Sequence, residues 1–197
     1  MATLIVTAHP DTGSLTHRAA QRVQELLPAG STETAHLAQE GFDPRFTDSD
    51  RRAYLERRPA GPDVLAEQQR VDRATDLVLV FPVWWWSMPA LLKGWVDRVF
   101  IGGWAFGFDE AGRVVPALGR LTAHLLPVSG TAAGSFARHG YAQSFSTQVE
   151  HGVLDYCGMR RGATAFLWES ESGDAAAVAR SLEEAAAAIA TAVGQRG

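Results

Sequence analysis

Between Val80 and Phe100 the chain reads VFPVWWWSMPALLKGWVDRVF, and this stretch predicts a strand, a short loop and a helix in succession. Leu77–Phe81 is a continuous apolar run with β-branched members, which is typical of a strand buried on both faces. Pro82 has no amide hydrogen to give to a sheet, so we expect the strand to stop there. Pro89 suits the first turn of a helix. The apolar residues behind it recur at helical spacing: Leu91, Leu92, Trp95, Val96, Val99 and Phe100.

Three consecutive tryptophans, Trp84, Trp85 and Trp86, are confined to the loop between this strand and this helix. Open α/β sheets bind their ligands in the loops at the carboxyl ends of their strands. One or two of the indoles could simply cover the core. Adjacent loop residues do not easily all point inward, however, and each indole presents roughly 150–250 Å² of surface. We therefore favour a binding surface for a flat, apolar ligand over packing alone.

The composition is that of a globular chain with an ordinary core. Its 197 residues carry a net charge of −4 and are 46% hydrophobic, and the arginines form no basic stripe, so nucleic acid is not an expected partner. The one cysteine, Cys157, lies among apolar residues and reads as a buried small hydrophobe. No cleavable signal or membrane-spanning run is visible. We expect a single domain over residues 1–197, no metal and a cytoplasmic location.

Short apolar runs alternate with helical patterns along the rest of the chain. Ser14 suits the N-cap of a helix that runs to about Leu27, and Asp174 suits the N-cap of a closing helix. Residues 38–62 form a polar excursion, functional or interfacial, with a helix around Ser49–Arg57. The other expected elements are strands at Thr3–Ala8, Glu33–Leu37, Leu121–Val128 and Ala163–Trp168, helices at Asp63–Ala74 and Ser146–Cys157, and a hairpin within Gly102–Val115.

Five strands separated by helices predict a parallel sheet with right-handed crossovers. We expect an α/β fold, a flavodoxin-like three-layer sandwich with a five-stranded parallel sheet of order 2-1-3-4-5, in preference to the order of dinucleotide-binding folds. In this order the loops after the first, third and fourth strands converge at one edge of the sheet. They are Ala8–Thr16, Pro82–Met88 and Val128–Phe136.

The first of these loops suits a phosphate group. His9, Ser14 and Thr16 stand beside the amides of a helix start, and such a start holds phosphate through its N–H groups, hydroxyls and an imidazolium. The loop has only Gly13 and lacks the pattern G-x-G-x-x-G. By itself it favours an ordinary helix cap. The other two loops shift the interpretation toward a phosphate site.

The loop after the fourth strand contains small residues, Gly130, Thr131 and Gly134, which let backbone amides approach a ligand closely. These amides suit the polar edge of a ring system whose face rests on the tryptophans. A phosphate near the first loop and an aromatic plane between the other two describe a flavin.

Motifs along the chain carry a family resemblance: Ala8-His9-Pro10, Ser14, Ala66-Glu-Gln68, Asp76-Leu77, Phe81-Pro82, Pro89–Ile101 and Tyr156-Cys-Gly158. In these the chain resembles the flavodoxin-like NAD(P)H quinone oxidoreductases, among them animal quinone reductase and the bacterial quinone-reductase accessory subunits of potassium-efflux systems. The resemblance extends to about Trp168, and the run from Phe81 to Ile101 is its most specific part.

The resemblance implies a role for each matching position. The flavin-binding residues that it implies are His9, Ser14, Leu15 and Thr16 around the phosphate and ribityl chain, Pro82, Val83, Trp84, Trp85 and Trp86 along the isoalloxazine, and Ser129, Gly130 and Thr131 at its polar edge. The implied substrate-lining residues are Phe106, Phe108, Phe136 and Tyr156, which in the family come partly from the second subunit of a dimer. Packing within the hairpin would explain Phe106 and Phe108 equally well.

The chain departs from the family at two positions in the loop after the fourth strand. The animal enzymes carry there a tyrosine and a histidine that are thought to stabilise charge during hydride transfer. Phe136 and Ala142 stand at these positions, and neither donates a hydrogen bond. His139 and Tyr141 lie nearby and are the candidate catalytic substitutes. The missing C-terminal extension of the animal proteins leaves the flavin as either FMN or FAD.

The resemblance implies an NAD(P)H:quinone oxidoreductase that passes hydride from NAD(P)H through bound flavin to a quinone or similar small acceptor, in ping-pong order. It also implies a homodimer. The alternative is a flavin-binding regulatory or accessory subunit of a potassium-efflux or other membrane system, peripheral to its membrane partner, because such subunits keep the enzyme's motifs. A one-electron carrier is disfavoured, because flavodoxins are strongly acidic and this chain is nearly neutral.

Overall fold

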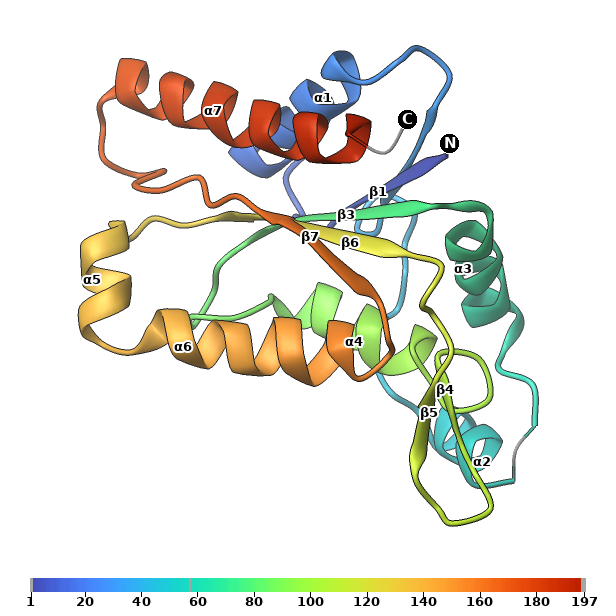
Figure 1. Ribbon diagram of the computed structural model, residues 1–197. Helices are drawn as coiled ribbons and strands as arrows, with labels where there is room; N and C mark the ends of the chain where they lie inside the picture. The colour runs from blue at the N-terminus through green and yellow to red at the C-terminus, as the bar shows by residue number, and fades with distance from the viewer. Residues whose placement is uncertain (1, 57, 196–197) are drawn as a thin grey trace.

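The computed structural model describes residues 2–56 and 58–195. Figure 1 shows a twisted sheet with helices on both faces and a small hairpin at one end. The elements are β1 Thr3–Thr7, α1 Leu15–Leu26, β2 Thr32–His36, α2 Asp48–Glu56, α3 Pro62–Arg73, β3 Asp76–Pro82, α4 Ala90–Val99, β4 Phe106–Phe108, β5 Val114–Pro116, β6 Thr122–Val128, α5 Ala133–Arg138, α6 Tyr141–Phe145, the π-helix η1 Ser146–Asp155, β7 Arg160–Thr164 and α7 Ala175–Gly194.

The main sheet has the order β2-β1-β3-β6-β7, and all of its neighbouring strands are parallel. This confirms the expected order 2-1-3-4-5. Helices α1 and α7 cover one face of the sheet, and α3, α4 and η1 cover the other (Figure 1). Strands β4 and β5 form a separate antiparallel pair, which confirms the expected hairpin. The carboxyl ends of β1, β3 and β6 therefore meet at one edge.

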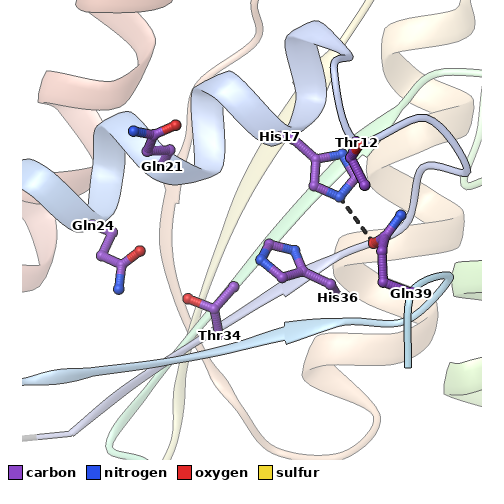
Figure 2. Close-up of a pocket in the computed structure, with 7 residues that line it drawn as sticks. All are labelled: Thr12, His17, Gln21, Gln24, Thr34, His36 and Gln39. Carbon is purple, nitrogen blue, oxygen red and sulfur yellow. Dashed lines mark hydrogen bonds between the residues drawn. The ribbon is translucent and has the colours of Figure 1, made fainter.

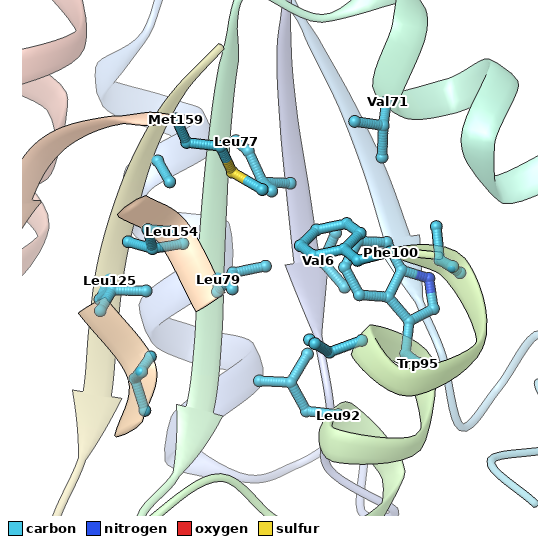
Figure 3. Packing of buried hydrophobic residues seen from close by; sticks show 14 of the residues in the cluster. Val6, Val71, Leu77, Leu79, Leu92, Trp95, Phe100, Leu125, Leu154 and Met159 are labelled. Atoms are coloured by element: carbon cyan, nitrogen blue, oxygen red, sulfur yellow. The ribbon is translucent and has the colours of Figure 1, made fainter. Parts of the chain in front are cut away.

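Two apolar clusters form the core, one on each face of the sheet. Neighbouring residues of β3 alternate between them, because strand side chains point to opposite faces. Val78 packs with α1 and α7, whereas Leu77 and Leu79 pack with α4 and η1 (Figure 3). Trp95 of α4 is wholly buried, and its indole N–H donates to a Glu67 carboxylate oxygen at 2.8 Å. A buried indole needs such an acceptor, so this bond fixes the packing of α4.

The last strand begins earlier than the apolar pattern predicts. It was expected at Ala163–Trp168, but β7 spans Arg160–Thr164, and the register with β6 shifts between Ala123 and Leu125. The apolar stretch that follows still runs beside β6, where the Leu167 amide donates to the Pro127 carbonyl oxygen at 2.9 Å. Strand β7 lies at the edge of the sheet, with a neighbouring strand on one side only, and none of its residues is fully buried, so no continuous apolar run is needed.

The region after β6 also differs from the expectation. The predicted loop Val128–Phe136 is shorter, because α5 begins at Ala133. The predicted helix at Ser146–Cys157 is the continuation of α6, which starts at Tyr141, and it is wound as the π-helix η1. Pro89 is the N-cap of α4 and stands one residue before its first turn.

The excursion after β2 is packed against α4. It contains α2 close to the expected helix, whose predicted last residue, Arg57, lies outside the described residues. Arg98 of α4 is 7% exposed, and its guanidinium lies 3.2 Å from an Asp50 oxygen and 2.8 Å from an Asp63 oxygen. It also donates to the Asp43 carbonyl oxygen at 2.8 Å. One buried cation thus ties this long segment to α4.

Within residues 2–56 and 58–195, no helix is long and apolar enough to cross a membrane. The same part of the chain holds no group of three or more His, Cys, Asp or Glu side chains that could bind a metal ion.

Candidate functional site

Three loops meet at the carboxyl edge of the sheet, as expected. The Val83 amide donates to the Val128 carbonyl oxygen at 2.8 Å, which joins the loops after β3 and β6. The His9 and Trp84 rings lie 5.9 Å apart, which brings the loop after β1 to the same place. The edge therefore presents an aromatic surface between two backbone loops.

The three tryptophans form a tight turn. Trp84 and Ser87 face each other through two backbone hydrogen bonds of 3.2 Å, and Trp85 and Trp86 occupy the centre with φ of 49° and 66°. Positive φ at both central residues is ordinarily met by Asn-Gly, and bulky residues are strained there. Trp85 is 91% exposed and Trp84 is 47% exposed. The strained turn thus holds Trp85 outward, and backbone strain of this kind clusters at functional sites.

Trp86 turns the other way and is supported from behind. Its ring stacks on Tyr141 at a centroid distance of 3.8 Å, and Phe136 meets its edge at 6.1 Å. The His139 ring lies 5.6 Å beyond Tyr141. Phe136 is 1% exposed, so it packs in the core and does not line a substrate cavity as the resemblance implied. The burial follows from α5, whose inward position Phe136 occupies.

The loop after β1 ends in a well-formed helix start. Ser14 is the N-cap of α1, and its Oγ accepts a hydrogen bond from the His17 amide at 3.4 Å. The first turn of α1 carries no acidic side chain. The amides of Leu15 and Thr16 head the helix and have no acceptor within it. Thr16 as a whole is only 2% exposed, so its hydroxyl is not presented at the surface of the loop. An anion is favoured at this helix start because the amides can donate to it, the helix dipole is positive there, and no carboxylate in the first turn repels it.

Histidines flank this helix start. The Nδ1 atom of His9 lies 3.1 Å from the Asp11 amide nitrogen and 3.3 Å from its carbonyl oxygen, which leaves Nε2 of this half-buried ring available. His17 is held at both ring nitrogens, 3.0 Å from Ser14 Oγ and 3.1 Å from Gln39 Oε1 (Figure 2). The sequence pattern did not single out His17 or Gln39, because their contact joins residues that are far apart in the chain.

A third histidine lies next to His17. The two rings of His17 and His36 are 5.0 Å apart, and His36 Nδ1 lies 2.7 Å from Thr7 Oγ1. Burial lowers the pKa of His36, and the neighbouring His17 lowers it further. His36 is therefore neutral at pH 7, and His17 adjoins a polar, uncharged ring.

The loop after β6 offers fewer free amides than expected. The Ser129 amide donates to the Leu167 carbonyl oxygen at 2.8 Å, and the Thr131 amide donates to Ser129 Oγ at 3.1 Å. These two amides are not available to a ligand, which corrects that part of the expectation. Within the described chain, the Gly130 amide has no such acceptor. A Cβ at Gly130 would lie 3.2 Å from the Glu171 carboxylate, a neighbour that no sequence pattern indicated.

The remaining predicted residues gather at a different cavity of about 500 Å³, between α4, η1 and the hairpin. The rings of Phe106 and Tyr156 lie 5.0 Å apart in its wall, and the Phe108 ring is 5.9 Å from Phe106. Burial raises the pKa of Cys157, which also lines this cavity, to about 11, so its thiol stays protonated. This confirms Cys157 as a small buried residue and excludes it as a thiolate nucleophile.

Comparisons with known proteins agree with this geometry. The model of a family described as having a flavodoxin-like fold matches residues 1–193. Human ribosyldihydronicotinamide dehydrogenase [quinone] is 32% identical over 185 residues, covering 80% of this chain and 77% of that protein. The structure of the NAD(P)H:quinone oxidoreductase from Methanothermobacter marburgensis superposes with a TM-score of 0.86 at 27% identity, covering 95% of this chain and 96% of that one.

A more distant structure shows the fold with a ligand. The FMN-dependent NADH-azoreductase from Bacillus anthracis, solved in complex with FMN, has a TM-score of 0.72 at 18% identity, covering 98% of this chain and 99% of that one. At this identity the likeness concerns the fold alone.

Proposed function

The chain belongs to the family with the flavodoxin-like fold, and from this premise we propose that it is a flavin-dependent NAD(P)H:quinone oxidoreductase. The observation that carries the proposal is the strained turn that exposes Trp85 beside a helix start suited to phosphate. A planar ring with a phosphate tail is the ligand that these two features describe together.

The residues present fit a flavin. The Leu15 and Thr16 amides and His9 would hold the phosphate, Trp84 and Trp85 would lie along the ring system, and the Gly130 amide would meet its polar edge. Bound flavin supplies the redox chemistry, taking up two electrons from a reduced nicotinamide and passing them to a quinone-like acceptor.

The chain's own contribution is binding and orientation. Amides at a helix start hold an anion without moving, so the phosphate would fix the position of the ring. The indole faces of Trp84 and Trp85 would cover one side of the bound ring and exclude water from it. A fixed plane lets a second flat molecule stack at a defined distance, which lowers the entropy cost of the reaction.

This proposal predicts a visible signature. The purified protein is expected to be yellow, to lose its absorption near 450 nm on addition of NADH or NADPH, and to regain it on addition of a quinone. The absorption spectrum, recorded anaerobically, measures each step. A colourless protein that binds neither FMN nor FAD would contradict the proposed function, and a flavoprotein that is not bleached by either nicotinamide would contradict the choice of electron donor.

We also propose that the enzyme is a homodimer whose second subunit completes the substrate cavity. Phe108 is 52% exposed at the hairpin, beside the exposed Val114 and Val115, and such an apolar patch is typical of an interface. Phe106 and Tyr156 are among the residues that line the cavity between α4, η1 and the hairpin.

Phe108→Glu is expected to convert a dimer into monomers, because it places a carboxylate in the apolar contact. Light scattering coupled to gel filtration measures the mass, and flavin content reports that the fold is retained. Leu26→Glu, at an exposed apolar residue of α1, is the matched control and should leave the mass unchanged. A wild-type protein that is monomeric and fully active would rule out the shared cavity.

An accessory flavoprotein of a membrane transport system is the second interpretation of the same motifs. It is less well supported, because the relatives that match most of the chain bear the names of quinone dehydrogenases and oxidoreductases.

A further inference from the structure

The Trp86 ring is attached to the segment after β6 through two aromatic side chains. It lies 3.8 Å from the Tyr141 ring, with only 6° between the two planes, and the Phe136 ring lies 6.1 Å away at an angle of 65°. Paired aromatic rings contribute packing energy beyond the area that they bury. The stack of Trp86 on Tyr141 is therefore a contact that can influence the conformation of the chain around Trp86.

That part of the chain is the tryptophan turn, Trp84–Ser87, and it is strained. Trp85 and Trp86 both have left-handed backbone conformations, which cost free energy at any bulky residue and persist only where the surrounding structure imposes them. The two backbone hydrogen bonds between Trp84 and Ser87 close the turn but do not remove this steric cost. Trp85 adds little packing, because it is exposed. Contacts of Trp86 and Ser87 with the rest of the protein must therefore stabilise the turn.

Both of these residues are contacted from one helical run. Tyr141 begins α6, which continues into η1, and Gln148 of η1 accepts a hydrogen bond from the Ser87 hydroxyl at 3.3 Å. The run is fixed in place, because its Phe145 and Val149 side chains are buried in the core. A ring carried by a helix that is anchored in this way has a defined position, so it can impose one conformation on the turn that it contacts.

The geometry at Tyr141 involves the ring more than the hydroxyl. The ring lies face to face with Trp86, and the His139 ring lies 5.6 Å from it and 29° from parallel. Stacking uses the faces of the rings, which phenylalanine shares with tyrosine. A proton donated to a substrate would require the phenol hydroxyl, which phenylalanine lacks. The two roles therefore respond differently to the same pair of substitutions.

We propose that Tyr141 is a positioning residue: by stacking on Trp86 it keeps the tryptophan turn in the conformation that presents Trp85, and it thereby sets the affinity for the ring bound there. The proposal rests on the proposed function, because it takes a flavin at Trp85 as given. It assigns to Tyr141 a role that acts through the turn, in place of direct contact with the reacting atoms.

Two variants separate the ring of Tyr141 from its hydroxyl. Tyr141→Ala is expected to raise the dissociation constant of the flavin roughly tenfold, whereas Tyr141→Phe should stay within about twofold of the wild type. Fluorescence titration of the flavin-free protein with FMN and with FAD measures both. Tyr54→Ala, at an exposed tyrosine of α2, is the matched control and should leave the constant unchanged. If Tyr141→Phe lost as much turnover as Tyr141→Ala, the hydroxyl would have a direct role and the proposal would be overturned.

A double-mutant cycle tests whether Tyr141 acts through Trp85. In a chain that already carries Trp85→Ala, the further change Tyr141→Ala is expected to weaken flavin binding by less than about twofold, because the indole that the turn presented is gone. A residue that only stabilised the fold would weaken binding equally in both chains. Equal effects in the two chains would therefore overturn the proposal.

A third measurement needs no flavin. The Trp84 and Ser87 amides donate the two hydrogen bonds of the turn, so their hydrogen exchange reports its opening. In the flavin-free protein both are expected to exchange about tenfold faster in Tyr141→Ala than in the wild type or in Tyr141→Phe, while the amides of β3 keep their rates. Unchanged exchange at the turn would contradict the proposal. A wild type that binds no flavin would instead refute the proposed function, and the exchange rates would still show whether Tyr141 stabilises the turn.

Discussion

Replacing Trp85 with alanine is expected to raise the dissociation constant of the flavin about 30- to 150-fold and to lower turnover at limiting flavin in parallel. The indole is 91% exposed, so nearly all of one face is available to a ligand. Covering about 100 Å² of apolar surface contributes ~2 kcal/mol, and stacking adds on the order of 1 kcal/mol. Fluorescence titration of the stripped protein with flavin measures the change.

Because Trp85 is exposed, its replacement should change flavin binding without changing the stability of the fold. Trp85 contributes little to the core, and alanine at the same positive φ carries a similar backbone strain, so the melting temperature should hardly move. Trp85→Phe keeps an aromatic face and should recover most of the affinity. If Trp85→Ala retained both flavin content and turnover, the tryptophan turn would not be the flavin surface.

Replacing Arg98 with methionine is expected to lower the free energy of unfolding by about 3–5 kcal/mol, because it leaves a buried carboxylate unpaired. Asp50 is nearly as buried as Arg98, whereas Asp63 is half exposed and can turn to water. The loss should detach the excursion after β2 from α4. Urea denaturation at pH 7, followed by tryptophan fluorescence, measures the change.

The pH dependence gives a second readout for Arg98. Burial pushes the pKa of Asp50 upward, but hydrogen bonds from Thr47 and Arg98 outweigh it and hold the pKa below its usual value. A carboxyl group of this kind stabilises the fold above its unfolded pKa of about 4 and loses that contribution as the pH falls through its lower folded pKa. The wild type should therefore lose stability below about pH 4 more steeply than Arg98→Met.

Lys93→Met is the matched control on the same helix. Lys93 pairs with Asp97 at 2.6 Å, but both side chains are exposed, and such pairs contribute less than about 1 kcal/mol. If Arg98→Met were no more costly than Lys93→Met, the buried cation would not be what holds the excursion in place.

The buried parallel sheet was predictable because its signals are local. Leu77–Phe81 is apolar without interruption and Leu121–Val128 is mainly apolar, as is typical of strands covered on both faces, and β3 ends at the proline that follows Phe81. β7 was misplaced for the same reason. Its arginines are exposed at the sheet edge, so no hydrophobic pattern marks where it starts.

The candidate site was predictable only as a set of loops. Order 2-1-3-4-5 brings the ends of β1, β3 and β6 together, so His9, Trp85 and Gly130 were expected to be neighbours. Which groups remain free at these positions depends on contacts between distant segments. The Leu167 carbonyl oxygen accepts a hydrogen bond from the Ser129 amide, and the Glu171 side chain lies beside Gly130. No local sequence pattern predicts either contact.

The sequence by itself determined the layers, the strand order and the place of the three tryptophans in a loop, because hydrophobic periodicity and proline placement act over a few residues. Only the tertiary structure decided that Phe136 is buried, that Trp86 stacks on Tyr141, and that His17 and His36 line one groove with three glutamines. The physical reason is that burial and hydrogen bonding at these positions depend on contacts between residues that are far apart in the sequence. Short-range sequence patterns do not predict such contacts.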